Sequence, residues 1–356
     1  MKVFHCDACQ QPVFFENIRC LSCDHALAFL PDVEDVGSLE QTADGRWHTP
    51  QAASRTYRLC ENYARENVCN WAVQVDDPHP LCIACRLTQT IPDLSQPGHR
   101  EAWYKLEVAK RRLLYDLLRL GVPVVNKQDD PENGLAFEFL ADTPGQKAVT
   151  GHADGLITIN LAEADDAERE QRRRAMHEPY RTLLGHCRHE SGHYYWDRLL
   201  RDSNRLDEFR RLFGDEREDY AAALQRHYEQ GAPSDWQAHY ISAYASSHAW
   251  EDWAETWAHY LHMTDSLETA ASCGLTLRPT HAQDPAIRAP VHPGISSFER
   301  MSADWFSLTY VLNNLNRGLG LPDGYPFVLS DQVRDKLRFV DEVVAASRPA
   351  FPSPTV

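Results

Sequence analysis

Residues 189–193 read His-Glu-Ser-Gly-His, so two histidines lie four positions apart with a glutamate directly after the first. On a helix, residues four apart share a face, and the imidazoles of His189 and His193 can therefore reach one metal ion. Glu190 lies about 100° further round the helix, where its carboxylate can contact a water in the fourth position of a zinc ion. Zinc lowers the pKa of that water toward ~7, and the carboxylate accepts its proton during attack on a carbonyl. This motif predicts a zinc centre for hydrolysis.

A hydrolytic zinc ion needs a third protein ligand and one open position. A third histidine on the same helix is excluded, because Trp196 and Leu199 fill the places of the glycine and histidine in the longer motif His-Glu-x-x-His-x-x-Gly-x-x-His. Residues 250–260 read WEDWAETWAHY, with Glu251 and Glu255 one helical turn apart. This spacing resembles that of the glutamate zincins, in which the first acid binds zinc and the second hydrogen-bonds a ligand histidine. The resemblance implies that Glu251 is the third ligand and that Glu255 orients an imidazole.

A solvated acidic face is the alternative interpretation of residues 250–260. In that arrangement the carboxylates of Glu251, Asp252 and Glu255 all face water, and the three tryptophans of the segment pack into the core. The metal site is favoured over this alternative because an upstream motif already supplies two ligands.

Peptide hydrolysis also needs a hydrogen-bond donor for the oxyanion of the tetrahedral intermediate. Tyr244 lies seven residues before Glu251, and some glutamate zincins carry a donor tyrosine at comparable spacing. We therefore expect Tyr244 to be the donor, with Tyr240 and His248 as alternatives. His186 shares the helix face of the ligand histidines, and we expect it to be a neighbour, because a fourth protein ligand would leave no place for water.

The chain has ten cysteines, of which eight lie before residue 90. Cys6, Cys9, Cys20 and Cys23 form two Cys-x-x-Cys pairs separated by ten residues. Each pair presents two thiolates to one metal, and two pairs complete a tetrahedron around a structural zinc ion. A rubredoxin-like iron site uses the same ligands and is the main alternative.

A second structural zinc site is predicted from Cys60, Cys69, Cys82 and Cys85. Only Cys82 and Cys85 form a Cys-x-x-Cys pair, so the alternative is that Cys60 and Cys69 are small buried hydrophobic residues. Four protein ligands leave no open position, so these sites would stabilise the fold and not catalyse. The expected cofactors are one catalytic zinc ion and one or two structural zinc ions.

The skewed distribution of cysteines and the turn-rich segment 91–99 (IPDLSQPGH) indicate a domain boundary. We expect a small zinc-ribbon-like four-cysteine module at residues 1–90, followed by a mostly helical zincin-like domain at residues 98–346. The second domain begins with a helix from Arg100, whose apolar residues recur at helical spacing until Gly121.

Two short runs, GLAFEFLAD at 134–142 and GLITINLAE at 155–163, alternate apolar residues with others and predict strands. Turn signals at Pro144-Gly145 and Asp154-Gly155 surround them, so we expect a short antiparallel sheet. The rest of the chain shows mainly helical periodicity, with Ser330 as the N-cap of the last helix. We expect these helices at 178–201, 205–230, 248–263, 297–317 and 330–346. The fold class predicted from the sequence is thus α+β.

The charge and hydropathy of the chain indicate where the protein is located and which partners it can bind. The 356 residues carry 36 Lys and Arg against 52 Asp and Glu, a net charge of −16, and residues 1–95 alone carry −6. Phosphate backbones repel such a chain, so nucleic acid is not expected as a partner. No run approaches the ~18–20 apolar residues of a membrane span, and the N-terminus lacks the apolar core of a signal peptide. We expect a cytoplasmic protein with mostly reduced thiols, no membrane association, a peptide or protein substrate and, through the module, a protein partner.

Five segments of the chain form a recognisable set: CDACQQPVFFENIRCLSCDHALAFLP, CNW, LCIACR, HESGHYYW and WEDWAETWAHYLHM. Together they resemble the bacterial zinc-binding metallopeptidases with an N-terminal zinc ribbon, over residues 1–345. The resemblance implies a zinc-ribbon module and a gluzincin-type peptidase that hydrolyses peptide bonds with a zinc-bound water activated by Glu190. A non-catalytic zinc-binding scaffold or adaptor on the same fold is the alternative, although the presence of Glu190 favours catalysis.

Overall fold

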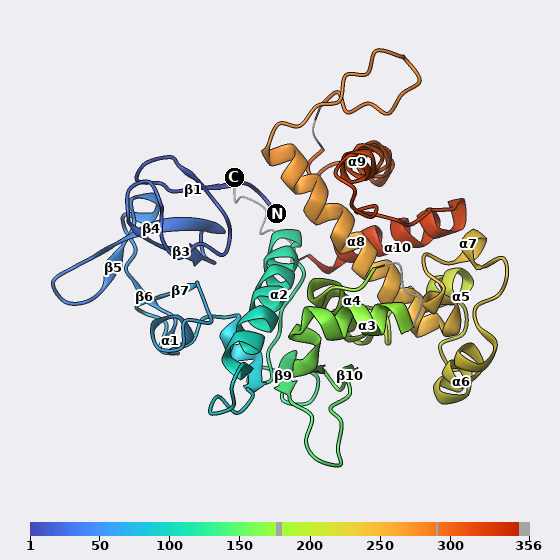
Figure 1. Cartoon of the computed structure of the whole chain (residues 1–356), viewed down its shortest axis with the longest axis horizontal. Helices are drawn as coiled ribbons and strands as arrows, with labels where there is room; N and C mark the ends of the chain where they lie inside the picture. Colours follow the sequence, from blue (N-terminus) through green and yellow to red (C-terminus); the bar gives the residue numbers. More distant parts are fainter. Residues whose placement is uncertain (176–179, 290, 349–356) are drawn as a thin grey trace. The chain divides into compact units, whose positions relative to one another are not determined.

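The computed structural model describes residues 1–175, 180–289 and 291–348 (Figure 1). Its contacts group the chain into two compact units. The cysteine-rich unit comprises Val3–Tyr115 and Val125–Arg172. The helical unit comprises Met1–Lys2, Asp116–Val124 and the described residues from Arg173 onward. Segments of the two units alternate along the chain. The sequence predicts two consecutive domains instead, and the limits of those domains stay a prediction.

Short strands dominate the cysteine-rich unit, where the described residues form three sheets. A two-stranded sheet pairs β1 (Phe4–His5) with β2 (Pro12–Val13). An antiparallel sheet has the order β3-β4-β5-β6-β7, with the bounds Ala26–Leu30, Asp35–Gln41, Trp47–His48, Tyr57–Leu59 and Ala72–Gln74. The third sheet has the order β10-β11-β9-β8, with the bounds Gly151–Ala153, Leu156–Asn160, Ala136–Leu140 and Thr88–Thr90. The helices of this part of the chain are α1 (Glu61–Ala64), α2 (His99–Leu120), α3 (Asp166–Ala175) and the short 3-10 turns Pro50–Ala52, Cys85–Leu87 and Leu161–Ala164.

A cluster of buried aromatic rings forms the centre of the cysteine-rich unit. The ring centroid of Phe29 lies 4.7 Å from that of Trp71 and 5.1 Å from that of Phe15. Phe4 and Tyr115 pack against Phe15 at 5.7 and 5.6 Å, and all five side chains are at most 2% exposed. Each such ring contributes roughly 1.5–3 kcal/mol through burial. The cluster therefore holds the first strands, which flank the cysteine pairs, against α2.

The predicted strands at 134–142 and 155–163 are present as β9 and β11, but their predicted antiparallel arrangement is wrong. β9 and β11 pair in parallel, and β8 pairs in parallel with the other edge of β9. The antiparallel neighbour of β11 is β10, a strand too short for the sequence pattern to indicate. Asp154 and Gly155 form the turn between them with φ of 48° and 81°, as in a type I′ hairpin. The sheet is therefore mixed.

Helices make up the helical unit, and together with the sheets they confirm the predicted α+β class for the described residues. Its longest helix, α8 (Ala249–Ser272), contacts both α4 (Leu183–Leu199) and α10 (Asp331–Ser347) (Figure 1). The other elements are α5 (Leu206–Phe213), α6 (Tyr220–Gln230), α7 (Trp236–His239), the 3-10 turn Tyr244–Ser247 and α9 (Phe298–Gly318). Among the described residues, no helix combines the length and the apolar character needed to cross a membrane.

The single helix predicted at 205–230 is wrong, because the chain breaks there into α5 and α6. Gly214 follows the end of α5 with φ of 105° and ψ of −173°, a conformation that a residue with a side chain rarely adopts. Asp219 then caps α6, since its side chain accepts a hydrogen bond from the backbone N–H of Ala222 at 2.9 Å. The break makes Tyr220 the first residue of a new helix.

Two other helix limits differ from the predictions, and one predicted N-cap is confirmed. Of the helix predicted at 178–201, residues 178 and 179 lie outside the described residues, and α4 begins after Thr182, whose hydroxyl accepts from Gly185 N–H at 3.0 Å. Helix α8 continues beyond the predicted end at 263 to Ser272. Ser330 is confirmed as the N-cap of α10, because its hydroxyl accepts from Val333 N–H at 3.2 Å.

Helices α4 and α8 approach each other closely at Gly192. A Cβ atom added to Gly192 would lie only 2.8 Å from the Cα of Ala254 and 3.3 Å from its Cβ. The indole nitrogen of Trp253 donates to the Gly192 carbonyl at 2.8 Å, and that of Trp257 donates to the Ser191 hydroxyl at 3.0 Å. Small residues and directional hydrogen bonds thus define how the two helices face each other.

We expect Gly192→Ala to reduce the free energy of unfolding by about 1–3 kcal/mol, because the added methyl group forces the two helices apart. The higher helix propensity of alanine, worth up to ~1 kcal/mol in a helix interior, offsets part of the cost of this clash. Urea denaturation monitored by tryptophan fluorescence measures the change. Gly318→Ala is the matched control, because nothing lies within 4 Å of its added Cβ, and it should be neutral or stabilising. Equal effects of both substitutions would contradict the close contact.

Candidate functional site

The helix pair α4 and α8 brings together the three residues predicted to bind a catalytic zinc ion. His189 Nε2 lies 3.1 Å from one carboxylate oxygen of Glu251, and His193 Nε2 lies 3.6 Å from the other. One ligand atom from each of the three residues lies within 4.8 Å of the others. Ligand atoms bound at ~2.0–2.1 Å in a zinc tetrahedron are about 3.3 Å apart. The three side chains therefore fit a zinc ion that keeps one position open.

Glu255 lies one turn after Glu251 and contacts the other side of the His189 ring. His189 Nδ1 lies 2.7 Å from Glu255 Oε1, and the hydroxyl of Ser242 donates to Glu255 Oε2 at 2.7 Å. A proton held between Nδ1 and a carboxylate fixes the imidazole tautomer and leaves Nε2 for a metal. The structure thus brings Glu255 into contact with His189, and its role in orienting a metal ligand stays a prediction.

The acidic residues of α8 are buried, so the alternative of a solvated acidic face is wrong. Glu251 is 1% exposed and Asp252 is fully buried. Asp252 points away from the ligand set and accepts from Lys336 Nζ of α10 at 2.5 Å. Adjacent residues on a helix differ by ~100° in direction. The Glu251 carboxylate therefore faces the two histidines, and the Asp252 carboxylate binds Lys336 of the neighbouring helix α10.

Electrostatics in the centre favour a bound cation. Burial lowers the pKa of the His189 imidazole, but hydrogen bonds to Glu251 and Glu255 outweigh it and hold that pKa well above its ordinary value. Burial likewise raises the pKa of Glu251, yet the charges and hydrogen bonds of His193 and His189 hold it well below its ordinary value. Burial also raises the pKa of Glu255, but hydrogen bonding to His189 holds it below its ordinary value, so both carboxylates stay ionised. A divalent metal ion there would displace the proton on His189 Nε2.

Glu190 and Tyr244 both lie beside the ligands. Glu190 is 9% exposed on α4, and its charge contributes to the raised pKa of Tyr220. The Tyr244 ring centroid lies 6.0 Å from that of His189. Burial, followed by the negative charge of Glu251, raises the Tyr244 pKa well above its ordinary value, so this phenol stays protonated and is able to donate.

Tyr220 is a site residue that the sequence analysis missed. Its phenol donates to Glu251 Oε1 at 2.6 Å, and burial followed by the charge of Glu251 raises its pKa well above the ordinary value. The signal that could have identified it is the pair of helix-breaking residues Gly214 and Asp219, because they place Tyr220 at a helix start. Periodicity alone did not reveal that break.

The alternatives to Tyr244 have other contacts. His248 caps α8, because Nδ1 accepts from Trp250 N–H at 3.1 Å while Nε2 lies 3.2 Å from the Glu218 carbonyl. Tyr240 packs under Lys336, whose Nζ lies 4.5 Å from the ring centroid. His186 is outside the group of three residues whose ligand atoms converge.

The first cysteine cluster has the spacing of a four-thiolate zinc site. Cys6 Sγ lies 3.6 Å from Cys23 Sγ, and Cys9 Sγ lies 3.6 Å from Cys20 Sγ. Four sulfurs at ~2.3 Å from zinc are about 3.8 Å apart in a regular tetrahedron. Cys9 is exposed, whereas Cys6 and Cys20 are buried, so this cluster lies at the surface of the cysteine-rich unit.

The second cluster unites Cys60, Cys69, Cys82 and Cys85, although only one pair follows the Cys-x-x-Cys pattern. Cys69 Sγ lies 3.7 Å from Cys82 Sγ, and all four residues are buried. Backbone N–H groups of Cys82 and Cys85 point at the sulfurs of Cys60 and Cys82, at 3.3 and 3.5 Å. Burial raises the pKa of the Cys82 thiol well above its ordinary value, so metal binding is needed to remove its proton.

A buried arginine offsets the charge that thiolates would bring to this second cluster. Arg111 of α2 is 1% exposed and donates to the carbonyl of Val68, next to Cys69, at 2.7 Å. Burial lowers the pKa of its guanidinium, but the negative charges of Cys69 and Glu107 raise it overall. Buried charges are tolerated when they are paired, and the arginine therefore fits a negatively charged metal–thiolate group.

We expect Cys82→Ser to lower the metal content by one ion per chain, from the three that the converging side chains would hold. Structural zinc stabilises small modules by about 10–16 kcal/mol, so the cysteine-rich unit should become sensitive to proteolysis. Elemental analysis and limited proteolysis measure these effects. Cys273→Ser is the control, because Cys273 is exposed and belongs to neither cluster. A Cys82→Ser protein that retains three ions would contradict the second cysteine site.

Comparisons with known proteins agree with these groups of ligands. Residues 99–343 match a family described as "Putative zinc-binding metallo-peptidase", and residues 3–96 match a zinc-ribbon domain. A protein of Mycobacterium bovis and proteins of two Mycobacterium tuberculosis strains, all described as uncharacterized, are each 43% identical to this chain over 352 residues. The aligned region covers 99% of this chain and 97% of each relative. No solved structure matches.

The family match covers most of the chain and includes both helices that carry the His189, His193 and Glu251 side chains. The zinc-ribbon match includes all eight clustered cysteines. The chain therefore belongs to this zinc-binding metallopeptidase family and carries a zinc ribbon ahead of the family's own domain.

Proposed function

We propose that this protein is a zinc-dependent peptidase that hydrolyses peptide bonds, with His189, His193 and Glu251 as metal ligands and Glu190 as the general base. The observation that carries the proposal is the buried carboxylate of Glu251, which lies 3.1 and 3.6 Å from two imidazole nitrogens. A buried carboxylate needs a cationic partner, and three ligands with one open position are typical of catalytic zinc. Two further zinc ions in the cysteine clusters would be structural.

The chemistry follows from the positions of the side chains. Zinc held by His189, His193 and Glu251 would polarise the substrate carbonyl and lower the pKa of water toward ~7. Glu190 accepts a proton from the attacking water and delivers it to the leaving amine nitrogen. Glu255 holds the His189 ring so that Nε2 faces the metal position.

The two phenols have different roles in this proposal. Tyr220 donates to Glu251 and therefore orients the carboxylate ligand. Tyr244 packs on the His189 ring and stays protonated, so it is the donor for the oxyanion that forms from the substrate carbonyl.

Glu190→Gln tests the enzyme directly. The amide cannot accept a proton, so cleavage of a diverse peptide library should fall by ~10²–10⁴-fold, while the metal content stays at the wild-type value. Glu251→Ala is the comparison variant, because it should lose both cleavage and the metal ion of this centre. Mass spectrometry of the products and elemental analysis give the two readouts.

Two results would count against the peptidase. Undiminished cleavage by metal-loaded Glu190→Gln would refute the role of the carboxylate. If metal-loaded wild type cleaves nothing in the library, the protein is a non-catalytic zinc-binding scaffold.

Tyr244→Phe and Tyr220→Phe form a matched pair that separates the two phenols. Loss of an oxyanion donor lowers kcat by about 10²–10³-fold, and we expect this for Tyr244→Phe with unchanged metal affinity. Loss of a group that orients a ligand weakens metal binding by ~10–100-fold, and we expect this for Tyr220→Phe. Steady-state kinetics and chelator competition measure both. If Tyr244→Phe weakened metal binding and Tyr220→Phe lowered only kcat, the two phenols would have each other's proposed role.

A further inference from the structure

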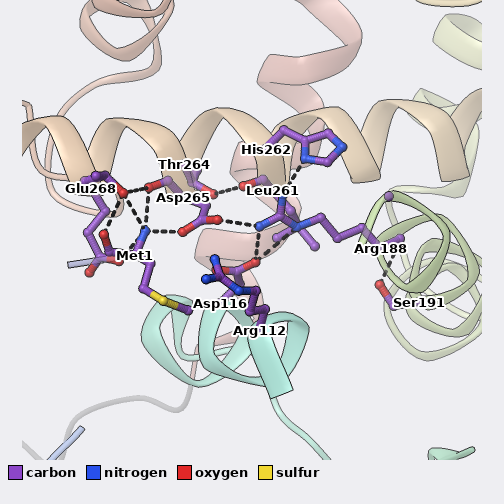
Figure 2. A network of polar contacts seen from close by, with 12 residues as sticks. Met1, Arg112, Asp116, Arg188, Ser191, Leu261, His262, Thr264, Asp265 and Glu268 are labelled. Atoms are coloured by element: carbon purple, nitrogen blue, oxygen red, sulfur yellow. Dashed lines mark hydrogen bonds and ion pairs between the residues drawn. The ribbon is translucent and has the colours of Figure 1, made fainter. Parts of the chain in front are cut away.

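Arg188 directly precedes the ligand His189 and lies at the centre of a buried polar network (Figure 2). Its side chain is 2% exposed. Nε and Nη2 donate to Asp116 Oδ2 at 3.1 and 2.6 Å, and Nη2 also donates to Asp265 Oδ2 at 2.7 Å. Nη1 contacts His262 Nδ1. One guanidinium therefore joins α4 to α8 and to the last turns of α2.

The charges in this network depend on Arg188. Asp116 and Asp265 have side chains only 4% and 14% exposed, so both carboxylates need a cation nearby. The second carboxylate oxygen of Asp265 pairs with the amino group of Met1, but Asp116 receives its ion pair from Arg188. Removal of the guanidinium would take away the ion pair of Asp116 and one of the two cations that pair with Asp265.

The network also completes a series of contacts between α4 and α8. The series begins at the candidate metal site, where Glu251 contacts His193. The next contacts are hydrogen bonds from Trp253 to the Gly192 carbonyl and from Trp257 to the Ser191 hydroxyl. Arg188 contacts Asp265 beyond these, at the far end of the series. A planar guanidinium bonds to several acceptors in fixed directions, unlike an ammonium group. The last contact of the series thus fixes direction at several acceptors, on both α8 and α2.

We propose that Arg188 is a positioning residue for the metal centre: its guanidinium fixes how α4 lies on α8, so that His189 and His193 face Glu251. The inference rests on the metal site of the proposed function and is independent of whether that site hydrolyses peptides. Arg188 itself does not belong to the ligand group. It acts through the helix that carries two of the ligands.

The test is cobalt(II) binding to the full-length chain, read from the visible absorption of the metal and from competition with a chelator. The difference between wild type and Glu251→Ala isolates the signal of this centre from that of the cysteine clusters. Arg188→Met removes the charge and keeps a long apolar side chain. We expect it to weaken cobalt binding at this centre by about tenfold or more, as losses around metal ligands do, and to change the cobalt absorption bands.

Lys336→Met is the matched control for a general loss of stability. Lys336 is a buried cation, 4% exposed, that also pairs with a carboxylate of α8, but its hydrogen bonds go to Asp252 and the His239 carbonyl and not to α4. We expect it to lower the unfolding midpoint as much as Arg188→Met does, with less than about a threefold change in cobalt affinity. Equal cobalt affinity in Arg188→Met and wild type, or equal losses in both Met variants, would overturn the proposal.

Arg188→Lys keeps the test decisive if Arg188→Met does not fold. The lysine retains the charge, but its ammonium cannot bond to both carboxylates in fixed directions. We expect a nearly wild-type unfolding midpoint with cobalt affinity still several-fold below wild type, whereas full recovery of affinity would show that charge alone suffices and overturn the positioning role. A cobalt signal in wild type that does not depend on Glu251 would overturn both the metal site and this inference. Cobalt binding without peptide cleavage would refute only the peptidase.

Discussion

The close contact between α4 and α8 at Gly192 sets the geometry on which the candidate metal centre of His189, His193 and Glu251 depends. The two histidines belong to one helix and Glu251 to the other, so the distances between ligand atoms follow from how the two helices lie against each other. A side chain at residue 192 would meet the backbone of Ala254, and packed interiors transmit such a strain because they contain few voids. The metal centre is thus a consequence of helix packing as much as of ligand identity.

Buried carboxylates are the main electrostatic cost of this arrangement. Each one has a defined partner: Asp252 meets Lys336, Asp265 meets Arg188, and Glu255 meets His189 together with Ser242. Breaking a buried pair is strongly destabilising because it leaves one charge without compensation. Glu251 and Glu255 differ from the two aspartates, since their neighbours are imidazoles and hydroxyl groups, none of which carries a permanent charge. A divalent cation would complete the compensation there.

Features set by local sequence were predictable, and features set by distant partners were not. His189, His193 and Glu190 follow from helical spacing alone, and the structure places them on one helix. The parallel pairing of β9 with β11 depends on the β10 hairpin between them, so strand alternation carried no information about direction. Tyr220 was missed because the break after Gly214 interrupts an otherwise helical pattern. Arg188 could not be recognised, since its partners lie 72 and 77 residues away in the sequence.

The three groups of ligands differ in a way that separates structure from chemistry. Each cysteine cluster offers four sulfurs, which complete a tetrahedron and exclude substrate. The histidine–glutamate centre offers three ligands, and the groups around it are a carboxylate, Glu190, and two protonated phenols, Tyr220 and Tyr244. Tyr220 donates to Glu251, but a purely structural site would have no use for a proton acceptor, Glu190, and a protonated phenol, Tyr244, beside an open position. This set of side chains therefore supports the proposed catalysis over metal storage or fold stabilisation.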